Sequence, residues 1–313
     1  MNSKKVSIAL ATYNGERFLH QQLNSLLAQS RLPEEIIICD DGSTDSTKSI
    51  LNEYKKKHPE IIAVYENKTN LGYIKNFERC ISLCTGDYIA LCDQDDIWEP
   101  QKLEILQNTI GESVLIHSDA SLIDSDGEII EISFTAVGKK DIKVDFTTLF
   151  FKPSITGCTL MFDRKILADI PAFPALIPHD YFISLLASEK GIAYVPIPLV
   201  KYRQHDKNIL GYQRHKTKKG LLFYARYFFL YKQIQRRIFE KHAVKFNLLR
   251  ETIANTADDR LKNTFNNIGT FLNSYTHKKP IDTDFSRQYN KYFKYFPNKN
   301  CIDYFMFPFS WMY

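Results

Sequence analysis

An apolar run that ends abruptly in three carboxylates is the feature that most constrains this chain. Residues 88–92 read Tyr-Ile-Ala-Leu-Cys, and Asp93, Asp95 and Asp96 follow within four positions. The run predicts a buried strand, and because side chains alternate along a strand, Asp93 and Asp95 would point the same way while Asp96 turns aside. Like charges this close stay ionised only beside a cation, a basic group or open water. Oxygen ligands of this kind suit Mg2+ or Mn2+, although a solvated loop that caps the next helix would look the same.

Strands and helices alternate regularly through the first hundred residues. Strands are expected at residues 6–12, 35–40, 61–65 and 88–92, with helices at 16–29, near 50–54 and at 74–84. This order predicts a mostly parallel, doubly wound α/β sheet, in which ligands gather at the carboxyl ends of the strands. Polar clusters follow three of the strands, at Thr12–Asn14, Asp40–Asp45 and Asp93–Asp96, so we expect a single functional rim.

The pattern becomes mixed beyond Trp98. The sequence predicts a strand at 114–117, a hairpin at 122–132, a strand at 154–162, a helix from Pro178 and a strand at 192–202. Pro196 and Pro198 lack the backbone N–H that an inner strand donates, so the last of these strands is expected at an edge of the sheet.

Residues 215–241 are basic and rich in aromatic side chains. Aromatic residues with interspersed lysines and arginines on a helix are typical of a peripheral membrane contact. The same pattern is typical of a helix that packs on the rest of the protein while its lysine stems lie along the surface. The sequence leaves both interpretations open, together with contact to another subunit in a homo-oligomer.

Composition limits the partners and the compartment. The net charge of +5 in 313 residues is mild, and no arginine-rich or RNA-binding signature indicates a nucleic-acid partner. The first residues lack the apolar region of a signal peptide, and no run of about 18 apolar residues predicts a membrane-spanning helix. The six cysteines lie mostly in apolar segments, so we expect reduced thiols in a cytoplasmic protein.

Seven motifs together give the chain a resemblance to a known family. They are Ala11–Gly15, Asp40–Asp45, Asn70–Gly72, Asp93–Trp98, Gly157–Cys158, His179–Asp180 and Tyr202–His205. Their order and spacing resemble the family 2 glycosyltransferases of the GT-A fold, particularly the bacterial branch with rhamnosyltransferases of O-antigen and capsule assembly. The resemblance spans residues 6–208. It implies a GT-A catalytic domain at 1–210, with a nucleotide-binding half at 1–100 and an acceptor-binding half at 101–210, followed by a mainly helical C-terminal extension at 211–313.

The resemblance also implies roles for individual residues. Asp180 would be the catalytic base, although the family more often has Glu-Asp here and His179 departs from that pattern. Asp95, with Asp93 and His205, would hold Mg2+ or Mn2+. Contacts with the nucleotide-sugar donor are expected from Thr12, Tyr13, Asn14, Asp41, Lys75, Asp93, Gln94 and Arg203, and acceptor contacts from Trp98, Gly157 and His179.

Several of these residues also have a plainer explanation. Asp41 would accept a hydrogen bond from N3–H of uracil or thymine, yet the segment Asp40–Asp45 also has the composition of a turn followed by a helix cap. His205 could be a solvated side chain near a strand end. Asp180 could cap the helix it begins, a role compatible with catalysis.

The expected activity is that of a metal-dependent, inverting glycosyltransferase. The preferred sugar donor is dTDP-rhamnose, with a UDP-hexose or UDP-HexNAc as the alternative, and the acceptor would be a saccharide or a lipid-linked oligosaccharide at the cytoplasmic membrane face. A nucleotidyltransferase is less expected because Asn14–Arg17 is short and lacks a glycine-rich basic loop. An inactive carbohydrate-binding module is less expected because neither the metal carboxylates nor the base is missing.

Overall fold

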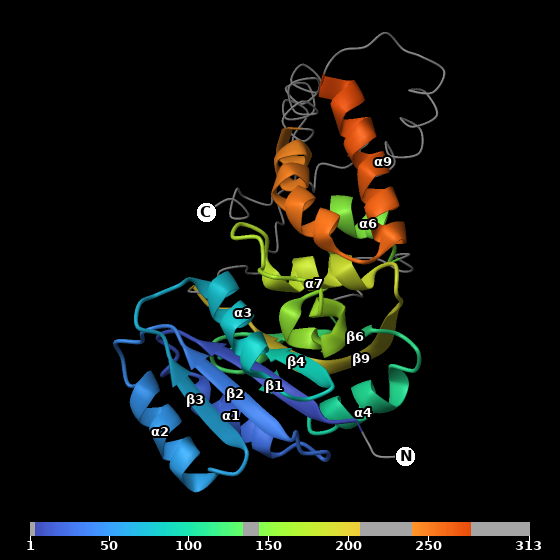
Figure 1. The fold of residues 1–313 in the computed structure, drawn as a ribbon. Helices are drawn as coiled ribbons and strands as arrows, with labels where there is room; N and C mark the ends of the chain where they lie inside the picture. Colours follow the sequence, from blue (N-terminus) through green and yellow to red (C-terminus); the bar gives the residue numbers. More distant parts are fainter. Residues whose placement is uncertain (1–3, 134–143, 207–239, 277–313) are drawn as a thin grey trace, which may run out of the picture.

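The structure, a computed structural model, describes residues 4–133, 144–206 and 240–276 (Figure 1). Its first half contains β1 (Val6–Thr12), α1 (Leu19–Leu27), β2 (Glu35–Asp40), α2 (Thr47–Lys57), β3 (Ile62–Glu66), α3 (Tyr73–Leu83) and β4 (Tyr88–Cys92). β1 pairs with β2 and β4, and β2 pairs with β3, all in parallel. The predicted alternation of strands and helices is confirmed.

The chain reverses its direction of travel across the sheet at β1. The strand order is β3-β2-β1-β4-β8-β6-β9-β5, with β7 beside β6. The chain runs outward from β1 to β2 and β3, and then returns to the other side of β1 as β4. Ligands of α/β sheets bind beside such a reversal, at the carboxyl ends of the strands.

The second half makes the sheet mixed. It contains β5 (Ile97–Trp98), α4 (Lys102–Thr109), β6 (Leu115–Ile123), β7 (Ile129–Glu131), α6 (Phe146–Phe151), the short 3-10 helix η1 (Gly157–Thr159), β8 (Leu160–Asp163), the 3-10 helix η2 (Arg164–Leu167), α7 (His179–Ala187) and β9 (Ile192–Arg203). β8 runs antiparallel to both β4 and β6. The start of β8 therefore lies at the same edge as the end of β4, which brings η1 beside the acidic loop.

The predicted edge position of the last strand is only partly confirmed. β9 pairs in parallel with β6 along its length, and its end also pairs with β5 at Val200 and Lys201. The register between β6 and β9 shifts around Pro198, where the ladder lacks a backbone N–H. Within the described residues, the part of β9 that contains the prolines pairs with a strand on one side only. The end of β9 pairs with strands on both sides and so lies inside the sheet.

Hydrophobic residues fill both faces of the sheet. Ile36 and Ile38 of β2 pack with α1, α2 and α4, whereas Ile37 and Cys39 of the same strand pack with α3, α6 and α7. This split follows from the alternation of side chains along a strand. Figure 1 shows α3 and α7 above the sheet and α2 below it. The sheet is thus covered by helices on both faces.

The helical residues 240–255 and α9 (Asp259–Thr276) share the core that contains α6 and α7. Phe265 of α9 stacks on Phe246 with ring centroids 4.1 Å apart, and its ring lies 6.1 Å from that of Phe146. Figure 1 shows these two helices rising side by side from α6 and α7. The mainly helical character of the extension is confirmed over residues 240–276, while the boundary at 210–211 and nearly all of segment 215–241 lie outside the described residues.

The cysteines and the hydropathy of the helices were also subjects of prediction. Cys39, Cys80, Cys84, Cys92 and Cys158 are buried free thiols, as expected, and Cys301 lies outside the described residues. None of the helices in the described ranges is both long and apolar enough to cross a membrane.

Candidate active site

The loops after β1, β2 and β4 meet at one edge of the sheet, as predicted. Thr12 at the end of β1 donates from Oγ1 to Oδ1 of Asp40 at the end of β2, over 3.1 Å. Gln94 of the third loop forms two hydrogen bonds with the backbone of Tyr13. It accepts from the Tyr13 N–H at 2.8 Å and donates to the Tyr13 carbonyl at 3.0 Å. The three polar clusters therefore form one continuous rim.

Four carboxyl groups influence one another in the middle of this rim. Burial raises the pKa of Asp93 well above its ordinary value, and the charges of Asp96, Asp95 and Asp180 raise it further. Burial, followed by the charge of Asp95, raises the pKa of Asp96 to about 7. Like charges in this arrangement favour either protonation or a bound cation.

The predicted orientation of the three acidic side chains is wrong in one respect. The ligand atoms of Asp93, Asp96 and Cys158 lie within 4.8 Å of one another, and Asp96 is 0% exposed. Asp95 instead pairs with His205, whose Nε2 lies 2.9 Å from Oδ2 of Asp95. The strand ends at Cys92, so the alternation that was expected to group Asp93 with Asp95 does not extend into the loop.

The acidic loop has the chemistry to hold a divalent cation. Oδ1 of Asp96 accepts a hydrogen bond from the Arg203 N–H over 2.9 Å, whereas Oδ2 is buried with no hydrogen-bond partner among the described residues. A buried carboxylate oxygen without a hydrogen-bond partner, beside a second carboxylate, favours a bound cation. Asp95 and His205 form a separate carboxylate–imidazole pair in the same loop region, and groups of these types fit Mn2+ well and Mg2+ through the carboxylates.

Asp180 lies in the first turn of α7 and is oriented by two backbone groups. The Gly157 N–H donates to Oδ2 over 2.9 Å, and the Tyr181 N–H donates to Oδ1 over 2.7 Å. Each carboxylate oxygen can accept a second hydrogen bond, so the group keeps capacity for a substrate hydroxyl. Burial and the nearby charge of Asp180 raise the pKa of Tyr73 to about 12, so the Tyr73 phenol stays protonated near Asp180.

Two of the three predicted acceptor residues adjoin Asp180. His179 stacks on Phe77 with ring centroids 3.8 Å apart, and burial lowers its pKa to about 4. Both of its ring nitrogens lack a hydrogen-bond partner within the part of the chain that the structure describes. A Cβ atom added at Gly157 would lie 3.4 Å from both Asp180 Oδ2 and His179 Nε2. These residues therefore surround one small region at the start of α7.

Trp98, the third predicted acceptor residue, lies elsewhere. Its side chain is 2% exposed and packs in the core under α1 and α4. The ammonium of Lys102 lies 3.3 Å from the centroid of its ring. Because the indole has almost no accessible surface, these contacts support a packing role for Trp98.

Asp41 is buried and holds the turn that leads into α3. Its carboxylate accepts from Asn67 Nδ2 at 2.6 Å, from the Leu71 N–H at 2.8 Å and from the Gly72 N–H at 2.9 Å. Gly72 has a φ of 80°, which its missing side chain allows. A base contact through Asp41 would use the remaining acceptor capacity of Oδ2, so this contact stays a prediction.

The loop after β1 is locked to the loop after β2. The N–H of Asn14 donates to Ser43 Oγ over 2.9 Å, and Asn14 Oδ1 accepts from the Thr44 N–H over 2.8 Å. Asn14 itself has a φ of 48°, a conformation that asparagine tolerates better than most residues. Tyr13 is 47% exposed, so its ring offers an aromatic surface to a ligand.

The two cations predicted to contact the sugar donor are already engaged. Lys75 donates to Glu78 at 2.6 Å and to the Phe173 carbonyl at 2.8 Å. Arg203 is 1% exposed, and its guanidinium donates to the Asp95 carbonyl at 2.8 Å and to Gln21 Oε1 at 2.7 Å. These contacts support a structural role for both side chains rather than a phosphate contact.

Sequence reasoning missed three residues of the site. Asn67 and Tyr73 lie beside Asp41 and Asp180 respectively, and Lys102 is fully buried below the acidic loop, where burial lowers its pKa to about 8. Asn67 and Tyr73 flank the motif Asn70–Gly72 in sequence, so the motif indicated their region. The signal for Lys102 was weak, because a lysine at the start of a helix is ordinarily exposed.

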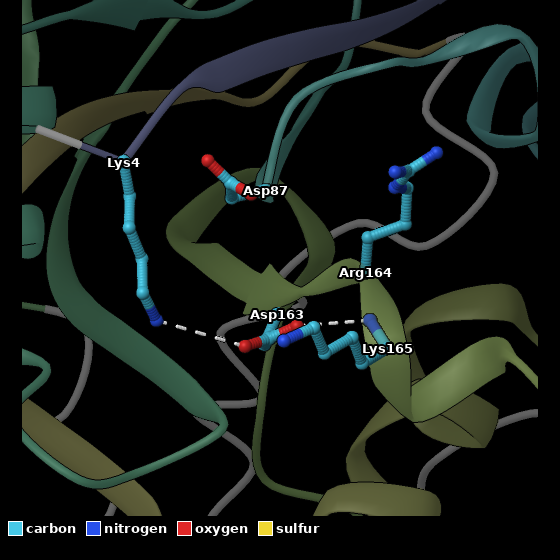
Figure 2. Close-up of a pocket in the computed structure, with 5 residues that line it drawn as sticks. All are labelled: Lys4, Asp87, Asp163, Arg164 and Lys165. Carbon is cyan, nitrogen blue, oxygen red and sulfur yellow. Dashed lines mark hydrogen bonds and ion pairs between the residues drawn. The ribbon is translucent and has the colours of Figure 1, made fainter. Parts of the chain in front are cut away.

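A small cavity lies at the opposite edge of the sheet. It has a volume of about 50 Å3 and is lined by Lys4, Asp87, Asp163, Arg164 and Lys165 (Figure 2). The ammonium of Lys4 lies 3.7 Å from Asp163 Oδ2, which partly neutralises the basic lining. Ligand pockets usually measure about 300–1,000 Å3, so this cavity is too small for a nucleotide sugar.

The sequence matches a family model over half of its length. The model described as "Glycosyl transferase family 2" covers residues 7–170. The chain is 31% identical over 221 residues to the dTDP-rhamnosyl transferase RfbG of Shigella flexneri, covering 64% of this chain and 73% of the relative. It is 30% identical over 215 residues to an uncharacterized protein of Mycobacterium tuberculosis, covering 65% of this chain and 60% of that protein's length.

Solved structures share the fold at low sequence identity. S. aureus TarS in complex with UDP-GlcNAc matches with a TM-score of 0.52 and 16% identity, over 94% of this chain and 82% of that one. GalNAc-T7 with UDP, GalNAc and Mn2+ matches with a TM-score of 0.54 and 15% identity, over 66% of this chain and 45% of that one. These likenesses confirm the predicted GT-A fold.

Proposed function

The chain belongs to glycosyl transferase family 2, and from that premise we propose that it transfers rhamnose from dTDP-rhamnose to a saccharide acceptor, with inversion and with a divalent metal. The similarity to a dTDP-rhamnosyl transferase of Shigella flexneri supports this donor. A UDP-hexose or UDP-HexNAc is the alternative, because uracil and thymine present the same N3–H to Asp41.

The segment Gly157–Cys158 carries the proposal, because it joins the proposed metal ligands to the proposed base. Gly157 N–H lies 2.9 Å from Asp180 Oδ2, and the ligand atom of Cys158 lies within 4.8 Å of those of Asp93 and Asp96. A diphosphate held at the acidic loop would therefore place its sugar near Asp180. An inverting transferase needs this separation of leaving group and base.

Asp180 acts as the general base. The acceptor hydroxyl donates to the Asp180 carboxylate, and its proton moves there as the oxygen attacks the anomeric carbon. The bond from that carbon to the diphosphate oxygen breaks at the same time, on the opposite side. The Gly157 and Tyr181 N–H groups hold the carboxylate in one orientation, so its remaining acceptor sites face the incoming hydroxyl.

The rim binds the sugar donor. Asp93, Asp95, Asp96 and His205 would hold Mn2+ or Mg2+, and the bound ion would offset the charge that develops on the departing diphosphate. The exposed ring of Tyr13 would cover the nucleobase of the donor. Asp41 would accept from N3–H, while Thr12, Asn14 and Gln94 keep the surrounding loops in position through the hydrogen bonds described above.

The acceptor side comprises His179 and Gly157. His179 is neutral at physiological pH, and its orphaned ring nitrogens could each bond a sugar hydroxyl, which would remove the cost of about 1–3 kcal/mol of an unpaired buried polar group. A lipid-linked oligosaccharide of cell-surface polysaccharide synthesis is the proposed acceptor class. We retain peripheral membrane contact through 215–241 as a part of this proposal.

A transfer assay with a panel of nucleotide sugars tests the proposal. Purified full chain with Mn2+ should release dTDP from dTDP-rhamnose in the presence of a saccharide acceptor. Asp180→Asn should lower turnover by about 100- to 10,000-fold while its nucleotide affinity stays within about twofold. The exposed control Asp169→Asn should behave like the wild type. Absence of transfer from every dTDP- and UDP-sugar, or near-normal turnover of Asp180→Asn, would contradict the proposal.

A further inference from the structure

Lys102 is a buried cation below the acidic loop. It begins α4, its side chain is 0% exposed, and its Nζ donates to the Cys158 carbonyl over 2.5 Å. The same ammonium lies 3.3 Å from the ring centroid of Trp98. A lysine is almost never buried in this way unless charged or polar partners compensate for its lost hydration.

The partners of Lys102 come from the acidic loop and from the segment Gly157–Cys158. Burial acts against the charged form of Lys102, whereas the neighbouring groups of Cys158, Cys92, Asp96 and Asp93 act in its favour. A buried charge that is held by polar partners contributes little to stability compared with apolar side chains of similar volume. The arrangement therefore calls for an explanation other than stability.

The residue that Lys102 contacts is next in sequence to the residue that contacts the proposed base. Cys158, whose carbonyl accepts from Lys102, follows Gly157, whose N–H donates to Asp180 Oδ2 over 2.9 Å. Both bonds are made within the three-residue helix η1, which lets a shift at one bond reach the other. The Lys102 side chain thus holds the middle residue of η1, and Asp180 bonds to its first residue.

We propose that Lys102 is a positioning residue for catalysis: its ammonium anchors Gly157–Cys158 between the acidic loop and α7, and thereby holds the Asp180 carboxylate in its productive orientation. This inference rests on the proposed function of Asp180 as the base. Lys102 does not touch the substrate, so its removal should affect turnover and leave nucleotide binding intact.

Lys102→Met, which keeps a long apolar side chain and removes the charge, tests the inference in the full chain. Its kcat should fall by about 10- to 100-fold, the loss that a misplacement of about 1 Å can cause. The affinity for UDP or dTDP with Mn2+ should stay within about threefold of the wild type. Lys102→Gln, a second neutral variant, should show the same division between turnover and binding. The matched control Lys56→Met removes an exposed lysine of α2 and should change neither quantity.

Amide hydrogen exchange provides a readout that does not need activity. The Gly157 amide should exchange at least about fivefold faster in Lys102→Met than in the wild type, and at the wild-type rate in Lys56→Met, because local opening exposes a protected N–H. If the wild-type chain transfers no sugar, the proposed function fails, while this exchange rate still decides whether Lys102 holds the segment.

Four results would overturn the inference. They are a kcat of Lys102→Met within twofold of the wild type, an unchanged Gly157 exchange rate, a loss of nucleotide affinity that parallels the loss of kcat, and failure of both neutral variants to fold. The third would assign Lys102 to the metal and nucleotide site, and the fourth to the stability of the fold.

Discussion

Aspartates that share one rim differ in chemistry because their immediate surroundings differ. Asp180 accepts hydrogen bonds from two backbone N–H groups, which fix the direction of its carboxylate. Asp96 and Asp93 are crowded by burial and by like charge, and Asp95 is paired with His205. One residue type thus supplies both a candidate base and candidate metal ligands.

Gly157→Ala tests the geometry around the base. A Cβ at this position would lie 3.3 Å from Asp180 Cβ, a contact tighter than most, so Asp180 or η1 must shift. We expect kcat to fall at least about tenfold, as misplacement of a reacting group commonly causes, with unchanged affinity for the nucleotide. Steady-state kinetics and calorimetry on the same preparation measure both. A wild-type kcat would show that Asp180 does not depend on this contact.

His179 gives the fold a predictable response to acid. Burial lowers its pKa to about 4, below the value of about 6.5 in an unfolded chain. The unfolded state therefore binds the proton first, so this contribution to stability is complete above pH 6.5 and is lost as the pH falls toward 4. Urea unfolding should show that the wild type loses about 2–3 kcal/mol more than His179→Leu between pH 7.5 and pH 4.5. Identical losses in the two proteins would refute this assignment.

Elements of the parallel half could be predicted because their signals are local. The strand predicted at 35–40 is β2 (Glu35–Asp40), and the polar end of each strand marked the rim. The strand predicted at 154–162 begins only at Leu160, because Gly157–Thr159 forms a turn of 3-10 helix. Gly157 N–H there bonds to Asp180, which is distant in sequence, so a local pattern contains no sign of it.

The contacts of Arg203 also could not be predicted from a local sequence pattern. A cation near a polar motif suggested a phosphate contact, yet the Arg203 guanidinium bonds to the carbonyls of Asp95, Asp124 and Ser125. These acceptors come from the loop after β4 and from the turn between β6 and β7. Only the folded chain brings them together, so the predicted role could not be corrected from sequence.

Arg203→Lys tests whether this side chain holds the loops. A lysine keeps the charge but cannot reach several carbonyls at once, and each buried acceptor left unpaired costs about 1–3 kcal/mol. We expect the free energy of unfolding to fall by at least about 2 kcal/mol, measured by urea denaturation. Lys201→Met, on the same strand with a partly exposed ion pair to Glu99, should change it by less than about 0.5 kcal/mol. Equal effects of the two variants would contradict the proposed role of Arg203.

At the scale of the whole molecule, the helices of 240–276 share one hydrophobic core with the α/β sheet. Leu249, Ile253 and Phe265 belong to the same hydrophobic core as residues of β2, β4 and α7. Lys245 donates to the Phe150 carbonyl of α6 over 2.8 Å. The sequence predicted an extension after residue 210. The packing of this extension depends on individual phenylalanines, and a basic, aromatic composition does not predict which residues they contact.

Phe265→Ala tests this shared core. Truncating a buried phenylalanine costs about 3–5 kcal/mol, and the loss should appear in a single unfolding transition of the full chain, followed by circular dichroism during urea unfolding. Val244→Ala, at an exposed site of the neighbouring helix, should change stability by less than about 0.5 kcal/mol. A separate early transition in Phe265→Ala would show instead that residues 240–276 fold as an independent unit.

We propose that the acidic loop serves metal-dependent nucleotide binding, whereas the start of α7 serves proton removal. Calorimetric titration of dTDP and UDP into the wild type, Asp95→Asn and Asp180→Asn, with Mn2+ or with EDTA, separates the two roles. We predict that the wild type and Asp180→Asn bind nucleotide with Mn2+, and that EDTA or Asp95→Asn weakens binding at least about tenfold. Binding that is equally tight without metal, or unchanged in Asp95→Asn, would show that the acidic loop does not bind nucleotide through a metal.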